Sequence, residues 1–308
     1  MRALLKIVSV VVAAVAMAAG LSVPQASAAA LTEVTRFGPN PSGLRMHLYV
    51  PGRLRARPPV LLAVHWCTGS GPDMHAGTDF TQLADKHGFI VIYPSAVRES
   101  HCFDVSSPQA LKRNGGSDPV GLASMVRHTV RRYHADASRV FVTGISSGAM
   151  TTNVMLANYP DMFAAGAAFA GVPAGCFATT DGSGWNNECS SGRILKTPRE
   201  WGDIARAAYP GYTGPRPRVQ LWHGTEDVGL HYANFGEEID QWTDVHGLST
   251  TPTSTDHPRP TWTRTRYGSA VEAISLQGVP HNLWTSGMAA EAIRFFGLDK
   301  PCRTASVE

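Results

Sequence analysis

Short apolar runs alternate along the chain with segments in which apolar residues recur at helical spacing. Residues 60–64 and 89–93 are continuous apolar runs of buried-strand length, and 80–87 between them has helical spacing. The pattern predicts strands at 45–50, 60–64, 89–93, 139–143, 164–170, 219–223 and 271–276, and helices at 80–87, 120–133, 149–159, 233–245 and 288–296. We interpret 45–50, which alternates and stops at a Pro-Gly pair, as an edge strand. The alternation from residue 60 onward predicts an α/β protein with a mostly parallel sheet covered by helices on both faces.

One stretch, 175–216, breaks this rhythm and is interpreted as a long loop. Long loops in compact domains are usually functional or disordered. No linker divides the rest of the chain, so we expect a single domain over 29–308.

The first 28 residues have the features of an export signal. Arg2 and Lys6 precede the uncharged apolar stretch 7–19, and small residues occupy 26–28. This order is typical of a secretory signal peptide, here 1–28, and predicts a secreted, extracellular protein. No later apolar run has the length of a bilayer span, so we expect no membrane association after cleavage.

The charge balance argues against a nucleic-acid partner. The whole chain has 27 Lys+Arg and 24 Asp+Glu, a formal net charge of +3. Both basic residues of the signal are lost with it, which leaves 25 basic against 24 acidic residues, a net charge of +1. A nucleic-acid-binding protein needs a basic stripe, which a nearly neutral chain does not favour.

Five cysteines agree with export into an oxidising environment. Cys176 and Cys189 flank a loop rich in Gly, Asn and Asp, so they are the preferred pair. Cys67 with Cys102 is the second preference, and Cys302 remains unpaired. Four cysteines allow three connectivities, so the spacing leaves the pairing open. No C-x-x-C or H-E-x-x-H spacing occurs, and we expect no metal site.

The strongest chemical motif is G-I-S-S-G at 144–148. It follows an apolar strand directly and precedes a helix, the setting of a nucleophile elbow. Small residues on both sides allow a sharp turn that exposes the Ser146 hydroxyl. The N–H of Ser147 lies at the helix start, where it can donate to an oxyanion. The alternative is a Gly-Ser loop that only caps a helix.

A serine nucleophile needs a base and an acid, and candidates for both follow it in the chain. His281 comes shortly after the strand 271–276, and Asp227 comes shortly after the strand 219–223. Ser146, Asp227 and His281 therefore stand in the hydrolase order, each on a loop after a different strand. His223, at a strand end, is expected to serve packing or hydrogen bonding.

The loop 65–69, after an early strand, supplies the candidate for a second oxyanion donor. We predict that this donor is the backbone N–H of Cys67, and that a bridge to Cys102 would hold the loop still. Thr68 of the same loop is a candidate substrate-binding residue.

Two tryptophans are further candidates for binding substrate. Trp185 lies among Gly and Asn residues without apolar periodicity, so an exposed ring could contact a sugar. A purely structural role is the alternative. Trp284, three residues after His281, is a candidate for the pocket wall.

Several longer motifs resemble one group of secreted esterases. They read HWCTG at 65–69, CFDVSS at 102–107, GISSGAM at 144–150, YPDMFAAG at 159–166, AGVPAGC at 170–176, YPGY at 209–212 and HGTED at 223–227. These motifs resemble the acetylxylan esterases of the first carbohydrate esterase family, which are related to feruloyl esterases and polyhydroxybutyrate depolymerases. The resemblance covers roughly residues 45–297.

This resemblance implies an α/β-hydrolase fold and a serine mechanism without a metal or other cofactor. It matches the nucleophile to Ser146, the acid to Asp227, the histidine to His281, and the oxyanion donors to the N–H groups of Cys67 and Ser147. The implied function is removal of acetyl groups from xylan, with acetylated xylan or a related plant cell-wall polysaccharide as the partner and a monomer as the expected state. Feruloyl esterase and polyhydroxybutyrate depolymerase are alternative activities. A catalytically inactive carbohydrate-binding protein is the alternative of another class.

Overall fold

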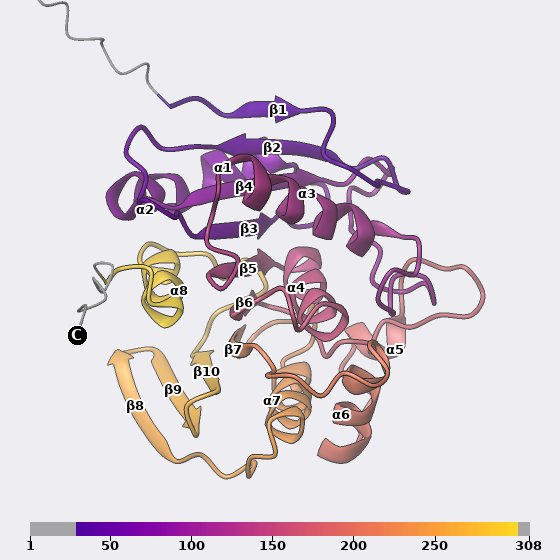
Figure 1. The fold of residues 1–308 in the computed structure, drawn as a ribbon. Coiled ribbons are helices and arrows are strands. Elements are labelled where there is room, and N and C mark those ends of the chain that lie inside the picture. The colour runs from indigo at the N-terminus through magenta and orange to yellow at the C-terminus, as the bar shows by residue number, and fades with distance from the viewer. Residues whose placement is uncertain (1–28, 301–308) are drawn as a thin grey trace, which may run out of the picture.

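A ten-stranded sheet forms the centre of the computed structural model, which describes residues 29–300 (Figure 1). The expected signal peptide, 1–28, and Cys302 lie outside the described residues. The strands are β1 Thr32–Val34, β2 Arg45–Tyr49, β3 Val60–Val64, β4 Ile90–Ser95, β5 Val140–Ile145, β6 Ala165–Phe169, β7 Arg218–Gly224, β8 Ser254–Arg259, β9 Trp262–Tyr267 and β10 Val271–Leu276. Their order in the sheet is β1-β2-β4-β3-β5-β6-β7-β10-β9-β8.

The expected parallel core of the sheet is confirmed. Strands β4, β3, β5, β6, β7 and β10 run parallel to their neighbours, with antiparallel strands at both ends. In β3, Leu62 joins the core on one face of the sheet and Leu61 joins the core on the other. Both faces are therefore buried, which explains why this strand is a continuous apolar run.

Helices cover both faces, as the alternation predicts. They are α1 Gly71–Gly77, α2 Phe80–His87, α3 Asp118–Arg132, α4 Ser147–Asn158, α5 Asn187–Ser190, α6 Pro198–Ala207, α7 Ala233–Val245 and α8 Met288–Phe296. Helices α3, α4 and α7 contribute Leu122, Leu156 and Trp242 to one core. Helices α1, α2 and α8 contribute to the other, and Figure 1 shows α2 and α8 on the side opposite α4 and α7.

The edges of the sheet differ from the sequence prediction. Strand β2 is not an edge strand, because β1 pairs with it on one side and β4 on the other. At the edge opposite β1, β8 and β9 form a hairpin that pairs with β10. Three strands therefore follow one another in the chain, where strands alternating with helices were expected. This hairpin includes His257, in β8.

The stretch 175–216 is not wholly a loop, since it contains α5 and α6. Thr197 and Glu200 form a reciprocal capping box at the start of α6, and Pro198 occupies its first turn. Trp201 of this helix is fully buried, and α6 packs against α7. The loop 175–186, which precedes α5, carries Trp185 toward the end of β5.

Candidate active site

The G-I-S-S-G motif forms a sharp turn between β5 and α4. Ser146 has φ 55° and ψ −116°, a conformation that side-chain-bearing residues rarely adopt. A Cβ on Gly144 would collide with the backbone of Gly148, and one on Gly148 would collide with the carbonyl of Val64. The crowding predicted from the motif is therefore present, and it forces small residues on both sides of the serine.

The structure brings Ser146, His281 and Asp227 together. His281 Nε2 lies 2.8 Å from Ser146 Oγ, and His281 Nδ1 lies 2.7 Å from Asp227 Oδ2. An ionised carboxylate can only accept hydrogen bonds, so Nδ1 carries the ring proton and Nε2 is free to accept the proton of Ser146. This arrangement can activate a serine hydroxyl.

Asp227 is buried and accepts hydrogen bonds on both oxygens. Its Oδ1 accepts from the backbone N–H groups of Gly229 and Leu230, each at 2.9 Å, while Oδ2 faces His281. His223 Nε2 lies 3.2 Å from the same Oδ2. Burial alone would raise the pKa of Asp227, but the imidazoles of His223 and His281 outweigh it and lower that pKa below its usual range. The carboxylate is thus held ionised.

The loop after β3 is held against this site by a buried histidine. The side chain of His65 donates from Nδ1 to the carbonyl of Trp66 at 2.6 Å, and its Nε2 accepts from the N–H of Ala96 at 3.2 Å. Burial lowers the pKa of His65 to about 4, so the ring is neutral at neutral pH. The N–H of Thr68 donates to Ser100 at 2.9 Å and fixes the other end of the loop.

Both preferred disulfides are present, Cys67–Cys102 and Cys176–Cys189. The first ties the loop after β3 to a segment that also contacts the elbow. The N–H of Phe103, next to Cys102, donates to Ser147 Oγ at 2.9 Å. Ser147 is the first residue of α4, so its own N–H has no acceptor within the helix. The two residues predicted to donate to an oxyanion are therefore joined through one short segment.

A pocket of about 640 Å³ opens over Ser146 and His281. Cys67 and the three predicted substrate-binding residues, Thr68, Trp185 and Trp284, all line it. Sequence reasoning did not include the other lining residues, which are Trp66, Gly77, Ile145, Gly229, Leu230, Asn282 and Leu283. Most of these residues lie next to predicted site residues in the chain, and this adjacency could have indicated that they line the pocket.

Trp185 is half-exposed, with 45% of its surface accessible. Its ring meets Phe177 edge-to-face at 5.0 Å, and its Nε1 donates to Asn187 at 3.1 Å. It also borders a second cleft of about 680 Å³, which Arg98, Gln109 and Thr180 help to line. One aromatic side chain thus borders both the pocket and this second cleft, called the polar cleft because most of its lining residues are polar.

Over residues 29–300, no group of three or more His, Cys, Asp or Glu side chains is arranged to hold a metal ion. In the same range, no helix is long and apolar enough to cross a bilayer.

The mostly parallel sheet, the elbow after β5 and the Ser-His-Asp arrangement define the α/β-hydrolase class. Comparison with known proteins narrows this class. A family model described as esterase PHB depolymerase matches residues 44–182. Acetylxylan esterase A of Aspergillus oryzae is 46% identical over 275 residues, covering 88% of this chain and 89% of that protein. Feruloyl esterase B of Talaromyces stipitatus is also 46% identical, over 84% of this chain and 74% of its own.

A solved structure gives the same result. The acetyl xylan esterase from Aspergillus awamori superposes with a TM-score of 0.85 at 41% identity, covering 87% of this chain and 99% of that one. The chain belongs to the acetylxylan esterase family, a family of carboxylic ester hydrolases. The resemblance seen in the sequence motifs and the expected α/β-hydrolase fold are thereby confirmed.

Proposed function

We propose that this protein is an exported serine esterase that removes O-acetyl groups from xylan. The observation that carries the proposal is the hydrogen-bonded series Ser146–His281–Asp227 beside a pocket, in a member of the acetylxylan esterase family. The near-neutral mature chain suits a neutral acetylated polysaccharide, which offers no charge for long-range attraction.

The proposed reaction begins when Ser146 Oγ attacks the acetyl carbonyl carbon and His281 Nε2 takes its proton. The N–H groups of Cys67 and Ser147 stabilise the oxyanion of the tetrahedral intermediate. When the intermediate collapses, the bond to the sugar oxygen breaks and the protonated His281 returns the proton to that oxygen. The products of this half-reaction are acetyl-Ser146 and the free sugar hydroxyl.

Water completes the cycle. His281 takes a proton from a water molecule, which attacks the acetyl-enzyme carbonyl and forms a second oxyanion. Collapse releases acetic acid, and the proton of His281 returns to Ser146 Oγ. Throughout, Asp227 fixes the tautomer of His281 and stabilises its imidazolium form.

We propose that the sugar chain crosses Trp185, with Thr68 and Trp284 bounding the side that holds the ester. Trp185 offers a half-exposed aromatic face and borders both the pocket and the polar cleft. An aromatic face beside polar groups suits a pyranose ring, which has apolar faces and hydroxyl edges.

The alternative activities call for a comparison of substrates. The feruloyl esterase relative is as similar in sequence as the acetylxylan esterase relative, so identity does not separate the two acyl groups. We expect faster hydrolysis of acetylated xylan than of feruloylated arabinoxylan or a polyhydroxybutyrate film. A faster rate on either of the last two would reassign the substrate. Failure of Ser146 to react with a serine-directed organophosphate would instead indicate an inactive binding protein.

Export is proposed from the N-terminal pattern and supported by the two disulfides, which form in oxidising compartments. Mass spectrometry of the mature protein in the culture medium would test it. The expected N-terminus is residue 29; an intact residue 1 would contradict cleavage.

A further inference from the structure

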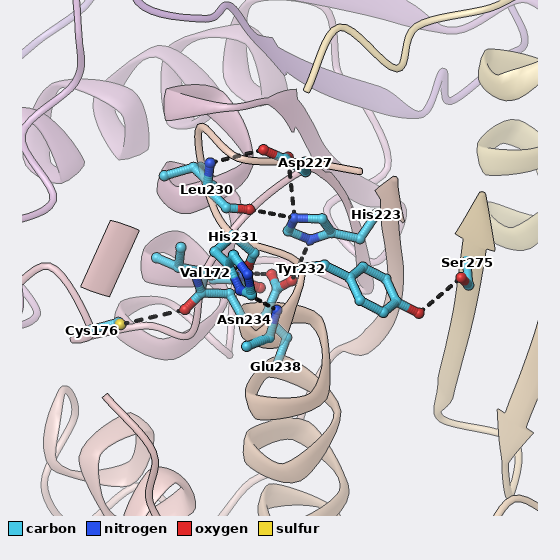
Figure 2. Close-up of polar contacts among 12 residues, drawn as sticks. Val172, Cys176, His223, Asp227, Leu230, His231, Tyr232, Asn234, Glu238 and Ser275 are labelled. Carbon is cyan, nitrogen blue, oxygen red and sulfur yellow. Dashed lines mark hydrogen bonds and ion pairs between the residues drawn. The ribbon is translucent and has the colours of Figure 1, made fainter. Parts of the chain in front are cut away.

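His223 is the next-to-last residue of β7, and the sequence indicated only a packing or hydrogen-bonding role for it. The structure places its fully buried imidazole between Asp227 and Glu238 of α7 (Figure 2). Its Nε2 lies 3.2 Å from Asp227 Oδ2, and its Nδ1 lies 3.9 Å from Glu238 Oε2. Two buried carboxylates therefore face opposite nitrogens of one buried ring.

The hydrogen-bond partners show where the protons lie. The carbonyl of Leu230 can only accept, so His223 Nε2, at 2.7 Å, carries a proton. Glu238 Oε1 accepts from Asn153 Nδ2 at 2.5 Å. Within the described residues, His223 Nδ1 and Glu238 Oε2 have no hydrogen-bond partner and are left facing each other. An uncompensated charge on either would be costly at this depth, so the pair retains one proton between them.

The surroundings favour that proton on His223. Its titratable neighbours are Asp227 from the loop after β7, Glu238 from α7, and Tyr232, the residue just before α7. The ring of Tyr232 lies edge-on to the imidazole, with 5.9 Å between the ring centroids. His281 lies on the other side of Asp227. Burial alone would lower the pKa of His223, but the contact with Asp227 and the charges of Asp227 and Glu238 raise it to about 9, while burial also raises the pKa of Glu238.

We propose that His223 is a positioning residue for ester hydrolysis: as an imidazolium stabilised by Glu238, it orients the Asp227 carboxylate toward His281. This inference rests on the proposed function, in which Asp227 is the acid of the triad. His223 and His281 approach the same oxygen, Oδ2, so its position is fixed from two sides. The positive charge on His223 lies nearer to Asp227 than the compensating charge on Glu238 does. It therefore offsets part of the negative charge of Asp227.

The matched variant is Glu238→Gln. Its amide oxygen can still accept from Asn153, and its NH₂ group can donate to Nδ1 of a neutral His223, whose Nε2–H to Leu230 is retained. Shape and packing stay nearly the same while the imidazolium is lost. We expect kcat on a small acetyl ester to fall about tenfold with KM nearly unchanged, because the residue does not touch substrate. The acidic limb of the pH profile of kcat/KM should move to higher pH by on the order of one unit, because the Asp227 carboxylate loses a neighbouring positive charge.

The control is Gln241→Met, on the same helix. The side chain of buried Gln241 forms its hydrogen bonds with the backbone of Ala174 and Trp201, and not with Asp227 or His223. This variant should lower the melting temperature without moving the acidic limb. His223→Gln should move that limb in the same direction as Glu238→Gln, and the double variant should move it no further. An unmoved limb in an active, folded Glu238→Gln protein, or an equal shift in Gln241→Met, would overturn the inference.

A second measurement needs no change at Glu238. In ¹⁵N NMR spectra of the imidazole nitrogens at about pH 7, both ring nitrogens of His223 should carry protons, with the signal assigned from its loss in His223→Gln. An unprotonated Nδ1 in the unmodified chain would overturn the inference. A wild-type protein that hydrolyses no ester would instead refute the proposed function, so the two failures are distinguishable.

Discussion

Replacing Asp227 with Asn should disable the proposed triad through the tautomer of His281. The backbone N–H groups of Gly229 and Leu230 point at Oδ1, so the amide oxygen of Asn must occupy that position. Its NH₂ group then takes the place of Oδ2 and faces His281 Nδ1, which lies 2.7 Å from Oδ2 in the native protein. Because NH₂ can only donate there, Nδ1 must lose its proton. His281 then presents N–H, instead of a lone pair, to Ser146.

A wrong tautomer of this kind costs a Ser-His-Asp triad about 10⁴ in kcat, equivalent to about 5.5 kcal/mol of activation free energy. We expect that loss for Asp227→Asn in a continuous assay with p-nitrophenyl acetate, after circular dichroism has shown that the variant is folded. Glu226→Gln is the matched control, because Glu226 is the adjacent acid and its side chain is exposed. It should keep wild-type activity. A folded Asp227→Asn protein within about tenfold of wild type, or an equal loss in Glu226→Gln, would refute this reasoning.

Three further predictions test the supports of the site. The folded-state pKa of His65 is about 4, against 6.5 for an unperturbed histidine, so its contribution to stability is complete above pH 6.5 and is lost as pH falls toward 4. About 3 kcal/mol of unfolding free energy should be lost over that pH range, as measured by urea unfolding at each pH. His65→Gln should lack this pH dependence, and an equal dependence in wild type and variant would contradict the prediction. Replacing both Cys67 and Cys102 with Ser should cost about 4 kcal/mol of stability and lower kcat by about 10- to 100-fold, because the loop that carries the proposed oxyanion donor, the Cys67 N–H, would loosen. A stability loss without a kcat loss would separate that bridge from catalysis. Thr180→Trp should fill the polar cleft, slowing acetate release from acetylated xylan but not p-nitrophenyl acetate hydrolysis; equal effects on both substrates would exclude the cleft from sugar binding.

The sequence was most informative where local patterns determine structure. Buried parallel strands are continuous apolar runs, and the loops after their carboxyl ends meet at one edge of the sheet. Ser146, Asp227 and His281 could therefore be placed together although they are far apart in the chain. The turn at Ser146 could be predicted because its neighbouring glycines are needed for steric reasons alone.

Strands β8 and β9 and helix α6 were not predicted from the sequence. The two strands depend on ion pairs with residues in other strands, whereas α6 has an N-terminal capping motif that was overlooked. Strands β8 and β9 are polar, and ion pairs of Arg264 with Asp256 and of Arg266 with Glu272 hold them on the sheet. Those pairs exist only after the hairpin and β10 have aligned. Helix α6, by contrast, did carry a local signal, the Thr197-x-x-Glu200 capping box.

The role inferred for His223 could not be predicted from its own segment. Its spacing from Asp227 is visible in the sequence, but its second carboxylate partner, Glu238, comes from a helix that packs behind the strand. Only the packing of α7 against β7 makes this imidazole the centre of a buried network.

The central claim is that Ser146 is the nucleophile of an esterase acting on acetylated xylan. The most direct test is to incubate wild-type protein and Ser146→Ala with acetylated xylan and to measure free acetate. We predict steady acetate release by the wild type and release at the background rate by Ser146→Ala. Equal release by both proteins, or none by either, would contradict the account.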